Sequence, residues 1–318
     1  MINIILKEDN NFSDWDDLIG KSRVSTFFQS TAWVNIWLKH FGGEPIIYYI
    51  YENNNLIGIA PLIRRNDKIN LLGMTPVLGG ELVSDHGDII ANSFSENLVW
   101  KEVLTKVKAD NPKLRIILDF IRNDSPSFAV LKELGGKQEQ VDVSPIIDLP
   151  QTWEEYLAAL DRHNRHELKR KIRRLEEEEI VKSCFLGDDR EITEFFRLMA
   201  LSNEQKRYFL SLEMKSFFEN IIITFTKREE LELSFLKKRD IYIAAVMVFY
   251  YNNHALLYNS GFDPTYSYLS PGLTLKAYMI KSAIETKKSH FDFLRGGEKY
   301  KFNLGAKERK LYRFTFGE

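Results

Sequence analysis

The sequence predicts an α/β (α+β) protein made of two domains that share one order of strands and helices. The length of 318 residues suits two domains at about 100–200 residues each. Strand and helix signals follow one order in the first half and return in the same order after Pro150. The hairpin segments 47–63 and 233–250 are also similar in amino-acid sequence. A period this long favours duplication of a domain over a solenoid.

The first domain is expected over residues 1–150 and begins with a strand followed by two helices. Ser13 and Ser30 are suitable N-caps for these helices, and glycines end both of them. The asparagine-rich turn 52–55 joins two apolar runs into a hairpin, because asparagine tolerates left-handed backbone. The predicted elements are strand 3–6, helices 13–20 and 30–40, strands 45–51, 56–63, 68–72 and 87–90, helix 95–109, strand 114–120, helix 126–134 and strand 145–149.

The second domain is expected over residues 151–318 and opens with one long basic helix, 152–179. After this helix the order of the first domain returns, including a hairpin that turns at residues 237–240. The remaining predicted elements are strand 181–185, helices 189–206 and 211–226, strands 230–236, 241–250 and 255–260, helix 271–286, strand 290–294, a short helical or irregular piece at 298–303 and strand 311–316.

The composition limits the kinds of site that the chain can build. Its 44 Lys plus Arg and 45 Asp plus Glu give a net charge of -1, so any anion-binding site must be local. The single cysteine, Cys184, excludes an intrachain disulfide and a zinc site made of cysteines, and its apolar strand context indicates a core residue. The N-terminus lacks a secretory apolar segment, and no run approaches the roughly 20 apolar residues of a membrane span. We expect a cytoplasmic protein.

The strongest local signal is a strand that leads through a loop into the sequence Ser270-Pro271-Gly272. Ser270 is a suitable N-cap, and Pro271 stands where its missing N–H costs nothing, so a helix should begin here. Gly272 would let a ligand approach the free N–H groups of the first turn, which favour an anion such as phosphate. The alternative is a well-capped helix with a structural role alone.

Polar residues gather in the segment 290–305, after a predicted strand and two glycines. Asp292 or Glu298 is the candidate base for an amine, and Tyr300 is the candidate acid for a leaving group. Lys299 and Lys301 are candidates to hold a phosphate or a departing anion. The alternative is a solvated turn with surface lysines. The segment is not a P-loop, because its glycines and lysine lack that spacing.

Taken together, these residues resemble the GNAT superfamily of N-acyltransferases, and within it the CelD-like branch (cellulose biosynthesis/BioF-like acetyltransferase) related to the Fem-type peptidyltransferases. The usual GNAT pyrophosphate signature is absent, and the Ser-Pro-Gly turn stands in its place. The resemblance extends over most of the chain. The matching positions are Tyr258, 260–263, 270–272, 291–293, Gly296, Tyr300, Lys301 and the basic run before Leu175, with Trp33, 59–62 and 84–88 in the first half.

The resemblance implies tandem GNAT-like domains, each a mixed, mostly antiparallel sheet flanked by helices. It implies transfer of an acyl or aminoacyl group to an amine of a sugar, a cell-envelope precursor or an amino acid. The donor is left open between acyl-CoA and aminoacyl-tRNA, so tRNA is a candidate partner, and no metal is implied. The resemblance places Lys301 against the phosphate of the leaving group. The donor-binding set that we expect is Tyr268, Ser270, Gly272 and Lys299.

Two further features have other interpretations. Arg162, Arg165, Lys169 and Arg173 share one helix face, which predicts either a solvated surface paired with nearby glutamates or a docking face for nucleic acid or another anionic polymer. The second interpretation makes the chain a non-catalytic binder through residues 162–174. In the first domain, Asp85, His86 and Asp88 form a short string that favours recognition of the acceptor over a metal site, because a metal needs three or four ligands at compatible geometry.

Overall fold

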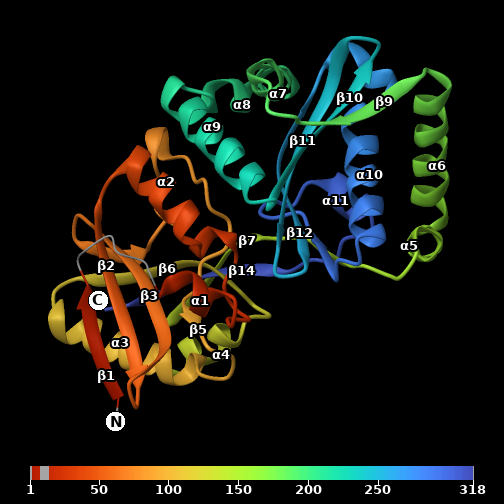
Figure 1. The fold of residues 1–318 in the computed structure, drawn as a ribbon. Coiled ribbons are helices and arrows are strands. Elements are labelled where there is room, and N and C mark those ends of the chain that lie inside the picture. Colours follow the sequence, from red (N-terminus) through yellow and green to blue (C-terminus); the bar gives the residue numbers. More distant parts are fainter. Residues whose placement is uncertain (1, 8–13, 318) are drawn as a thin grey trace. The chain divides into compact units, whose positions relative to one another are not determined.

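A computed structural model describes residues 2–7 and 14–317, which divide into two compact units (Figure 1). The first unit comprises Met1–Val143 and Arg309–Glu318, and the second comprises Ser144–Glu308. The expected domains were 1–150 and 151–318. The chain therefore enters the second unit at Ser144, before Pro150, and its last segment belongs to the first unit.

The first unit is built on one mixed sheet with the strand order β1-β2-β3-β4-β6-β14-β7, and β5 pairs with β3. The neighbouring strands are antiparallel except β4 and β6, which are parallel. The β2–β3 hairpin turns at Asn53 and Asn54, both at positive φ, as predicted. The strands are β1 (Ile2–Lys7), β2 (Glu44–Glu52), β3 (Asn55–Arg65), β4 (Lys68–Leu71), β5 (Ile90–Ala91), β6 (Arg115–Arg122), β7 (Lys137–Val143) and β14 (Lys310–Phe316).

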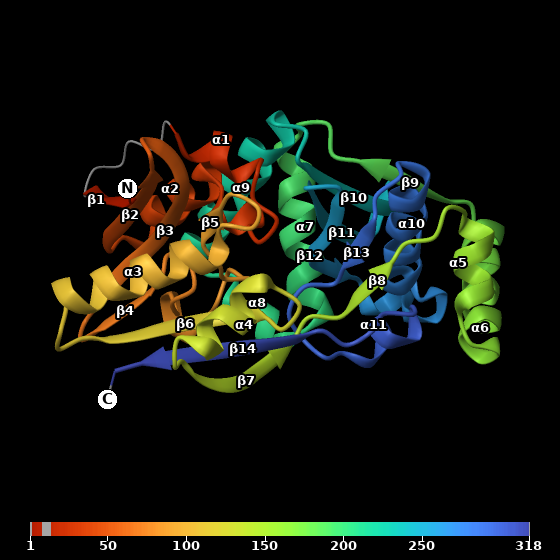
Figure 2. The ribbon, with the colours of Figure 1, turned by 90° about the horizontal axis from the view of Figure 1, so that it is seen from below.

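Helices of the first unit begin where the sequence places caps. The Ser30 hydroxyl accepts a hydrogen bond from the Trp33 N–H, and the predicted cap Ser13 lies outside the described residues. The helix α3 (Glu96–Asp110) packs on β1, β2 and β3 and lies beside α4 (Pro126–Glu133) (Figure 2). The helical elements are α1 (Trp15–Ile19), η1 (Phe27–Gln29), α2 (Thr31–Phe41), η2 (Leu78–Gly80), α3 (Glu96–Asp110) and α4 (Pro126–Glu133).

The second unit is built on a sheet with the strand order β8-β13-β12-β11-β10-β9. Its neighbouring strands are antiparallel except β12 and β13, which are parallel. The sheet lies between α10 (Pro271–Glu285) on one face and α7 (Asp189–Ser202) with α9 (Leu212–Lys227) on the other (Figure 1). The strands are β8 (Ile146–Asp148), β9 (Ile180–Cys184), β10 (Leu231–Lys238), β11 (Ile241–Tyr251), β12 (His254–Phe262) and β13 (His290–Asp292).

Two helices predicted as single elements are each broken in the structure. Leu160 is extended and the Asp161 carboxylate accepts from the Asn164 N–H, so a new helix begins there instead of one helix over 152–179. Asn203 breaks the predicted helix 189–206 in the same way. The helical elements are α5 (Trp153–Ala159), α6 (Arg162–Glu177), α7 (Asp189–Ser202), α8 (Glu204–Phe209), α9 (Leu212–Lys227), η3 (Pro264–Leu269), α10 (Pro271–Glu285) and α11 (Lys299–Asn303).

Both units share one topology, four antiparallel strands followed by a parallel fifth, and the predicted fold class is confirmed. A further strand then pairs antiparallel with each fifth strand. In the first unit this strand is β14, from the C-terminal end of the chain, and in the second it is β8, from the segment that follows β7. Each sheet therefore contains one strand that is distant along the chain from the strand it pairs with.

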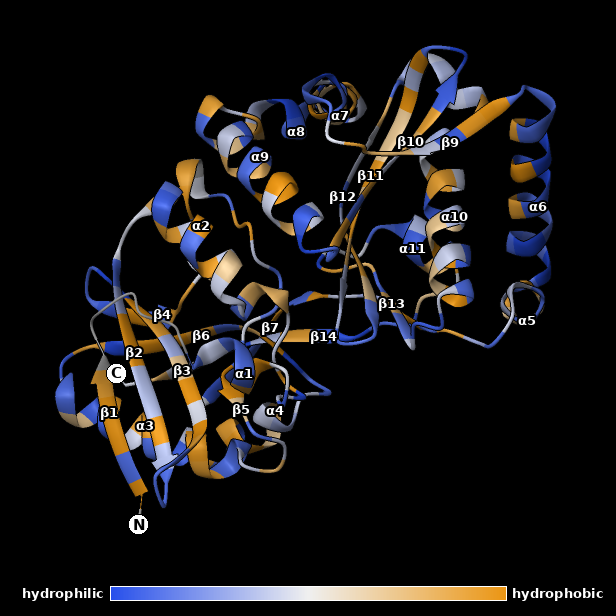
Figure 3. Cartoon of the chain, in the orientation of Figure 1, coloured by the Kyte–Doolittle hydropathy of each residue, from blue (hydrophilic) through white to orange (hydrophobic). Residues whose placement is uncertain are grey.

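The surface of α6 is mostly hydrophilic, with a narrow hydrophobic stripe (Figure 3). Leu168 and Leu175 on this stripe are buried, whereas Arg162, Lys169 and Arg173 are exposed. Only a few of the basic groups are engaged: Arg170 pairs with Glu167, and others donate to backbone carbonyls. Within the described residues, no helix combines the length and apolar character needed to cross a membrane.

Candidate active site

The pairing of β12 with β13 stops early, and this opens the sheet of the second unit. The two strands pair in parallel only from His254 to Leu256, although β12 continues to Phe262. The register of β12 against β11 also shifts between Met247 and Val248, which marks a β-bulge. The second half of β12 therefore borders a pocket instead of a neighbouring strand.

The loop after β12 leads directly into α10. The Asp263 carboxylate accepts from the Thr265 N–H and hydroxyl and fixes the start of this loop. Ser270 stands at the N-cap position, but its backbone is left-handed (φ 53°) and its side chain caps nothing, which corrects the predicted role. The first helical bond runs from the Thr274 N–H to the Ser270 carbonyl. The N–H groups before it, including that of Gly272, lie at the pocket and favour an anion.

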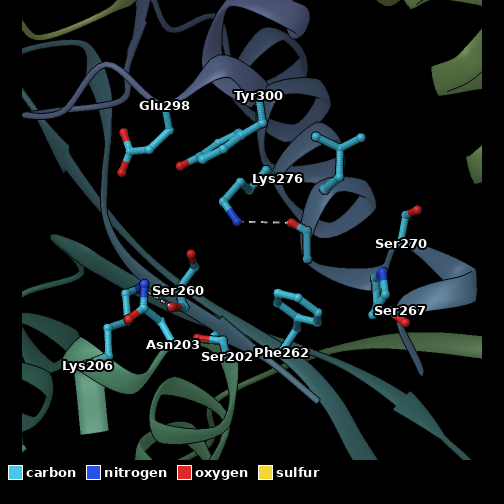
Figure 4. Close-up of a pocket in the computed structure, with 14 residues that line it drawn as sticks. Ser202, Asn203, Lys206, Ser260, Phe262, Ser267, Ser270, Lys276, Glu298 and Tyr300 are labelled. Carbon is cyan, nitrogen blue, oxygen red and sulfur yellow. Dashed lines mark hydrogen bonds between the residues drawn. The ribbon is translucent and has the colours of Figure 1, made fainter. Parts of the chain in front are cut away.

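The pocket has a volume of about 430 Å³ (Figure 4). Its walls come from the α7–α8 junction, the second half of β12, the turn into α10, the first two turns of α10, and the segment that carries Glu298 and Tyr300. Figure 4 shows the Lys276 ammonium, the Glu298 carboxylate and the Ser260 hydroxyl pointing toward one space, with the Tyr300 ring above it. Polar groups from three different parts of the second unit thus meet here.

Lys276 is a buried cation inside this pocket, only 7% exposed. Its Nζ donates to the Gly272 carbonyl at 3.2 Å and lies 4.9 Å from the centre of the Tyr300 ring. Burial lowers the pKa of Lys276 to about 7, and the Lys206 and Lys301 charges act in the same direction. This lysine therefore exchanges its proton near neutral pH.

Lys206 reaches the same pocket from α8. Its Nζ donates to the Ser260 carbonyl at 2.6 Å and to the Asn259 Oδ1 at 3.0 Å. Burial lowers the pKa of Lys206 to about 8, and the Glu298 charge opposes this change. Neither lysine was predicted from the sequence. Lys276 stands among apolar positions of a predicted helix, which was a usable signal, whereas nothing in the text marked Lys206.

Glu298 presents a half-exposed carboxylate at the pocket. Partial burial acts to raise its pKa, but the hydrogen bond and charge of Lys301, 2.8 Å away, outweigh burial and hold the pKa below its usual range. Gly296, at φ +108°, makes room for this carboxylate, because a Cβ there would lie 2.6 Å from the Glu298 Oε2. Glu298 is therefore ionised at neutral pH and held in place.

Lys301 is buried beside the pocket and does not line it. Its ammonium donates to the carbonyls of Arg295 (2.8 Å), Gly296 (2.9 Å) and Leu294 (3.4 Å), besides pairing with Glu298. These four partners occupy all of its N–H groups. In this structure Lys301 holds the glycine loop and orients Glu298.

Tyr300 lines the pocket with a phenol that stays protonated. Burial raises the pKa of Tyr300 well above its ordinary value, and the Glu298 charge adds to this. The group can therefore donate a hydrogen bond or a proton. Of the predicted site residues, Tyr300, Glu298, Ser270 and Gly272 lie together at the pocket.

Three predicted site residues of the second unit lie away from the pocket. Asp292 is 1% exposed, and its Oδ1 accepts from the Ser144 hydroxyl and the Leu294 N–H, so the carboxylate is enclosed at the end of β13. Tyr268 is half-exposed and its carbonyl accepts from Arg174. Lys299 is exposed at the first position of α11.

Asp85, His86 and Asp88, predicted for acceptor recognition, are buried in the first unit. Asp88 accepts from the hydroxyls of Ser125 and Ser127 and from the Ile89 N–H, and burial raises its pKa to about 6. These bonds tie the segment before β5 to the start of α4. In the described ranges, no group of three or more His, Cys, Asp or Glu side chains is placed to hold a metal ion.

Residues 162–302 match the family model described as Acetyltransferase (GNAT) domain, and this range contains every residue that lines the pocket. The second unit therefore carries a GNAT-type acetyltransferase domain. No curated protein sequence matches the chain significantly.

Solved structures with the same fold include a Fem-like member and a tandem GNAT protein. FemX superposes with a TM-score of 0.69 at 14% identity, covering 98% of this chain and 96% of its own. L-PGS from Bacillus licheniformis gives 0.57 at 12% identity, covering 88% and 90%. A tandem GNAT protein from the clavulanic acid biosynthesis pathway gives 0.51 at 9% identity, covering 99% and 98%. At these identities the likeness concerns the fold, and it confirms the predicted tandem GNAT architecture.

Proposed function

We propose that the second unit transfers an acyl or aminoacyl group from a phosphate-containing carrier to an amine of a sugar, a cell-envelope precursor or an amino acid. The observation that carries this proposal is the pocket at the N-terminus of α10, inside the matched GNAT domain. This pocket combines a site for an anion with a carboxylate and a phenol suited to proton transfer.

The carrier's phosphate is assigned to the first turn of α10. The N–H groups of Gly272 and Leu273 precede the first helical hydrogen bond, and the helix dipole adds partial positive charge there. Acyl-CoA and aminoacyl-tRNA both carry the phosphate that this position favours. Because both carriers occur in the cytoplasm, we place the reaction there.

The chemistry that we assign is direct transfer with two proton carriers. The acceptor must lose an ammonium proton before its nitrogen attacks, and the ionised Glu298 at the pocket is the group placed to take it. The new C–N bond forms as the bond from the acyl carbon to the carrier breaks. Tyr300 is placed to give its proton to the departing sulfur or oxygen, and the phenolate then takes the second proton of the acylated nitrogen, which restores the phenol.

The test combines donor binding with a matched pair of glutamine variants. Thermal melts with acetyl-CoA and with aminoacyl-tRNA should show one carrier stabilising the protein by about 2.7 kcal/mol at 100 times its Kd. Glu298→Gln should lower kcat by a factor on the order of 10²–10⁴ and remove the acidic limb of the pH profile, with unchanged donor affinity. The exposed Glu308, changed to Gln, is the control. Stabilisation by neither carrier would overturn the proposal.

The exposed basic face of α6 supports a second candidate, a non-catalytic binder of nucleic acid or another anionic polymer. Arg162, Lys169 and Arg173 are exposed on this helix. Binding of a polymer through these side chains should weaken steeply with salt, because each neutralised phosphate releases counterions. Tight, salt-dependent binding of RNA without any acyl transfer would favour this candidate over the enzyme.

A further inference from the structure

The pocket of the second unit contains more buried positive charge than its own residues neutralise. Three ammonium groups, Lys206, Lys276 and Lys301, influence one another there together with a single carboxylate, Glu298. Lys301 and Glu298 form a close pair and offset each other. In the part of the chain that the structure describes, neither Lys206 nor Lys276 has a carboxylate at ion-pair distance.

The two ammonium groups of Lys206 and Lys276 also have more N–H donors than acceptors. An ammonium has three N–H donors. Lys276 makes one hydrogen bond, a 3.2 Å contact with the Gly272 carbonyl, and Lys206 makes two. Two donors of Lys276 and one of Lys206 thus have no acceptor among residues 2–7 and 14–317. Both side chains line the pocket, and Figure 4 shows the Lys276 ammonium directed into its open space near Ser260.

A buried ammonium without a counter-charge is costly, and an apolar residue of similar size would be more stable in its place. A bound anion removes this cost, because it supplies both the missing charge and the missing acceptors. Figure 4 shows the Ser260 hydroxyl at the same space, and Gly272 and Leu273, whose N–H groups precede the first helical hydrogen bond, also line the pocket, so all three add neutral donors. The pocket thus presents donors from α8, β12 and α10 to one ligand group.

We propose that Lys206 and Lys276 form an anion site inside the pocket that binds a phosphate or carboxylate group of the substrate. The assignment rests on the proposed function, because it gives the acyl-transfer substrate a compact acidic group. That group is either part of the carrier's phosphate or a carboxylate of the acceptor or the acyl chain. In both cases its oxygens accept from the two ammonium groups, while Lys301 continues to hold Glu298.

Anion binding at this site should take up protons from solution. At pH 8 the free Lys276, with a pKa of about 7, is mostly neutral, and Lys206, with a pKa of about 8, is half charged. A bound anion favours the charged form of both, so about one and a half protons should enter with each anion, roughly one at Lys276 and half of one at Lys206. Glu298 and Tyr300 line the same space, but Glu298 is already ionised and Tyr300 already protonated, so neither contributes to this uptake.

The experiment is calorimetric titration of the whole protein at pH 8 in two buffers that differ in ionisation enthalpy, with pyrophosphate and malonate as probes. Wild type should bind at least one probe with uptake of about one and a half protons. Lys276→Met should bind it at least tenfold more weakly, and its uptake should fall to the roughly half a proton that Lys206 contributes. Lys206→Met should also weaken binding. Lys281→Met, on the exposed face of the same helix, is the control and should match wild type.

The two probes distinguish the sources of the anion, with pyrophosphate representing the carrier and malonate representing the acceptor or acyl chain. Binding of either probe without proton uptake, or an unchanged affinity in the Lys276→Met variant with a normal melt, would overturn the assignment. Binding of neither probe would overturn it as well. Acetyl-CoA and aminoacyl-tRNA are titrated in parallel: if one binds but takes up no protons, the anion site fails while the proposed function stands.

Discussion

Gly261 on β12 provides the sharpest test of how α7 and the sheet of the second unit are packed. A Cβ at this position would lie 2.3 Å from the Leu198 carbonyl carbon, 2.3 Å from the Met199 nitrogen and 2.5 Å from the Leu198 oxygen. These are backbone atoms in the buried middle of α7, so they cannot turn away as a side-chain end can. The backbone of Gly261 is not left-handed, so the cost of Gly261→Ala is purely steric.

Overpacking of a core typically costs about 1–3 kcal/mol, and a clash with helix backbone belongs at the upper end of that range. For a unit of this size, each kcal/mol lowers Tm by roughly 2–4 °C, so the Gly261→Ala variant should melt about 6–12 °C lower. Differential scanning calorimetry measures this. The control is Gly272→Ala, whose Cβ has the Phe262 side chain as its nearest neighbour, at 3.2 Å, and this ring can shift. Equal Tm values for wild type and Gly261→Ala would refute the packing described here.

Three further variants test the site. Gly272→Glu should weaken donor binding at least tenfold by steric block and like charge, with Tm nearly unchanged; normal affinity in a titration would remove this turn from the donor site. Lys301→Ala should raise the pKa of Glu298 and move the acidic limb of kcat/KM to higher pH, which a pH profile measures; an unmoved limb would contradict its positioning role. Lys276→Met should be more stable than wild type below pH 7. Because the pKa of Lys276 falls from 10.5 to about 7 on folding, wild type should regain about 1.4 kcal/mol per pH unit between these values, and parallel stability curves from urea titrations would contradict this.

Much of the fold was readable from local signals in the sequence. The turn at Asn53 and Asn54, the proline at the start of α4 and the Ser30 cap act within a few residues, and each lies where the sequence placed it. The glycine loop before Glu298 and the turn before Gly272 also depend on neighbouring residues alone, so both could be predicted from the sequence as parts of a candidate site.

Other features depend on partners that are distant along the chain. The strand β7 (Lys137–Val143) was missed because its residues are mostly polar and exposed, and it is recognised as a strand only by its pairing with β14. That β14 belongs to the first unit, and β8 to the second, is decided by which sheet edge each segment meets. No local pattern records such a choice.

The residues of the pocket also divide into those that local sequence predicts and those that only tertiary contacts bring together. Glu298 and Tyr300 lie in a polar segment that the sequence marked as a candidate site, and both line the pocket. Asp292 was predicted from the same segment, but its carboxylate is enclosed by a hydroxyl and a backbone N–H. Lys206 and Lys276 resemble ordinary lysines in the sequence. Burial of both in one pocket lowers their pKa values, and burial is a property of the packed chain. The sequence therefore determined the elements and several polar groups of the site, and only the tertiary structure decided which charges meet there and in which protonation state.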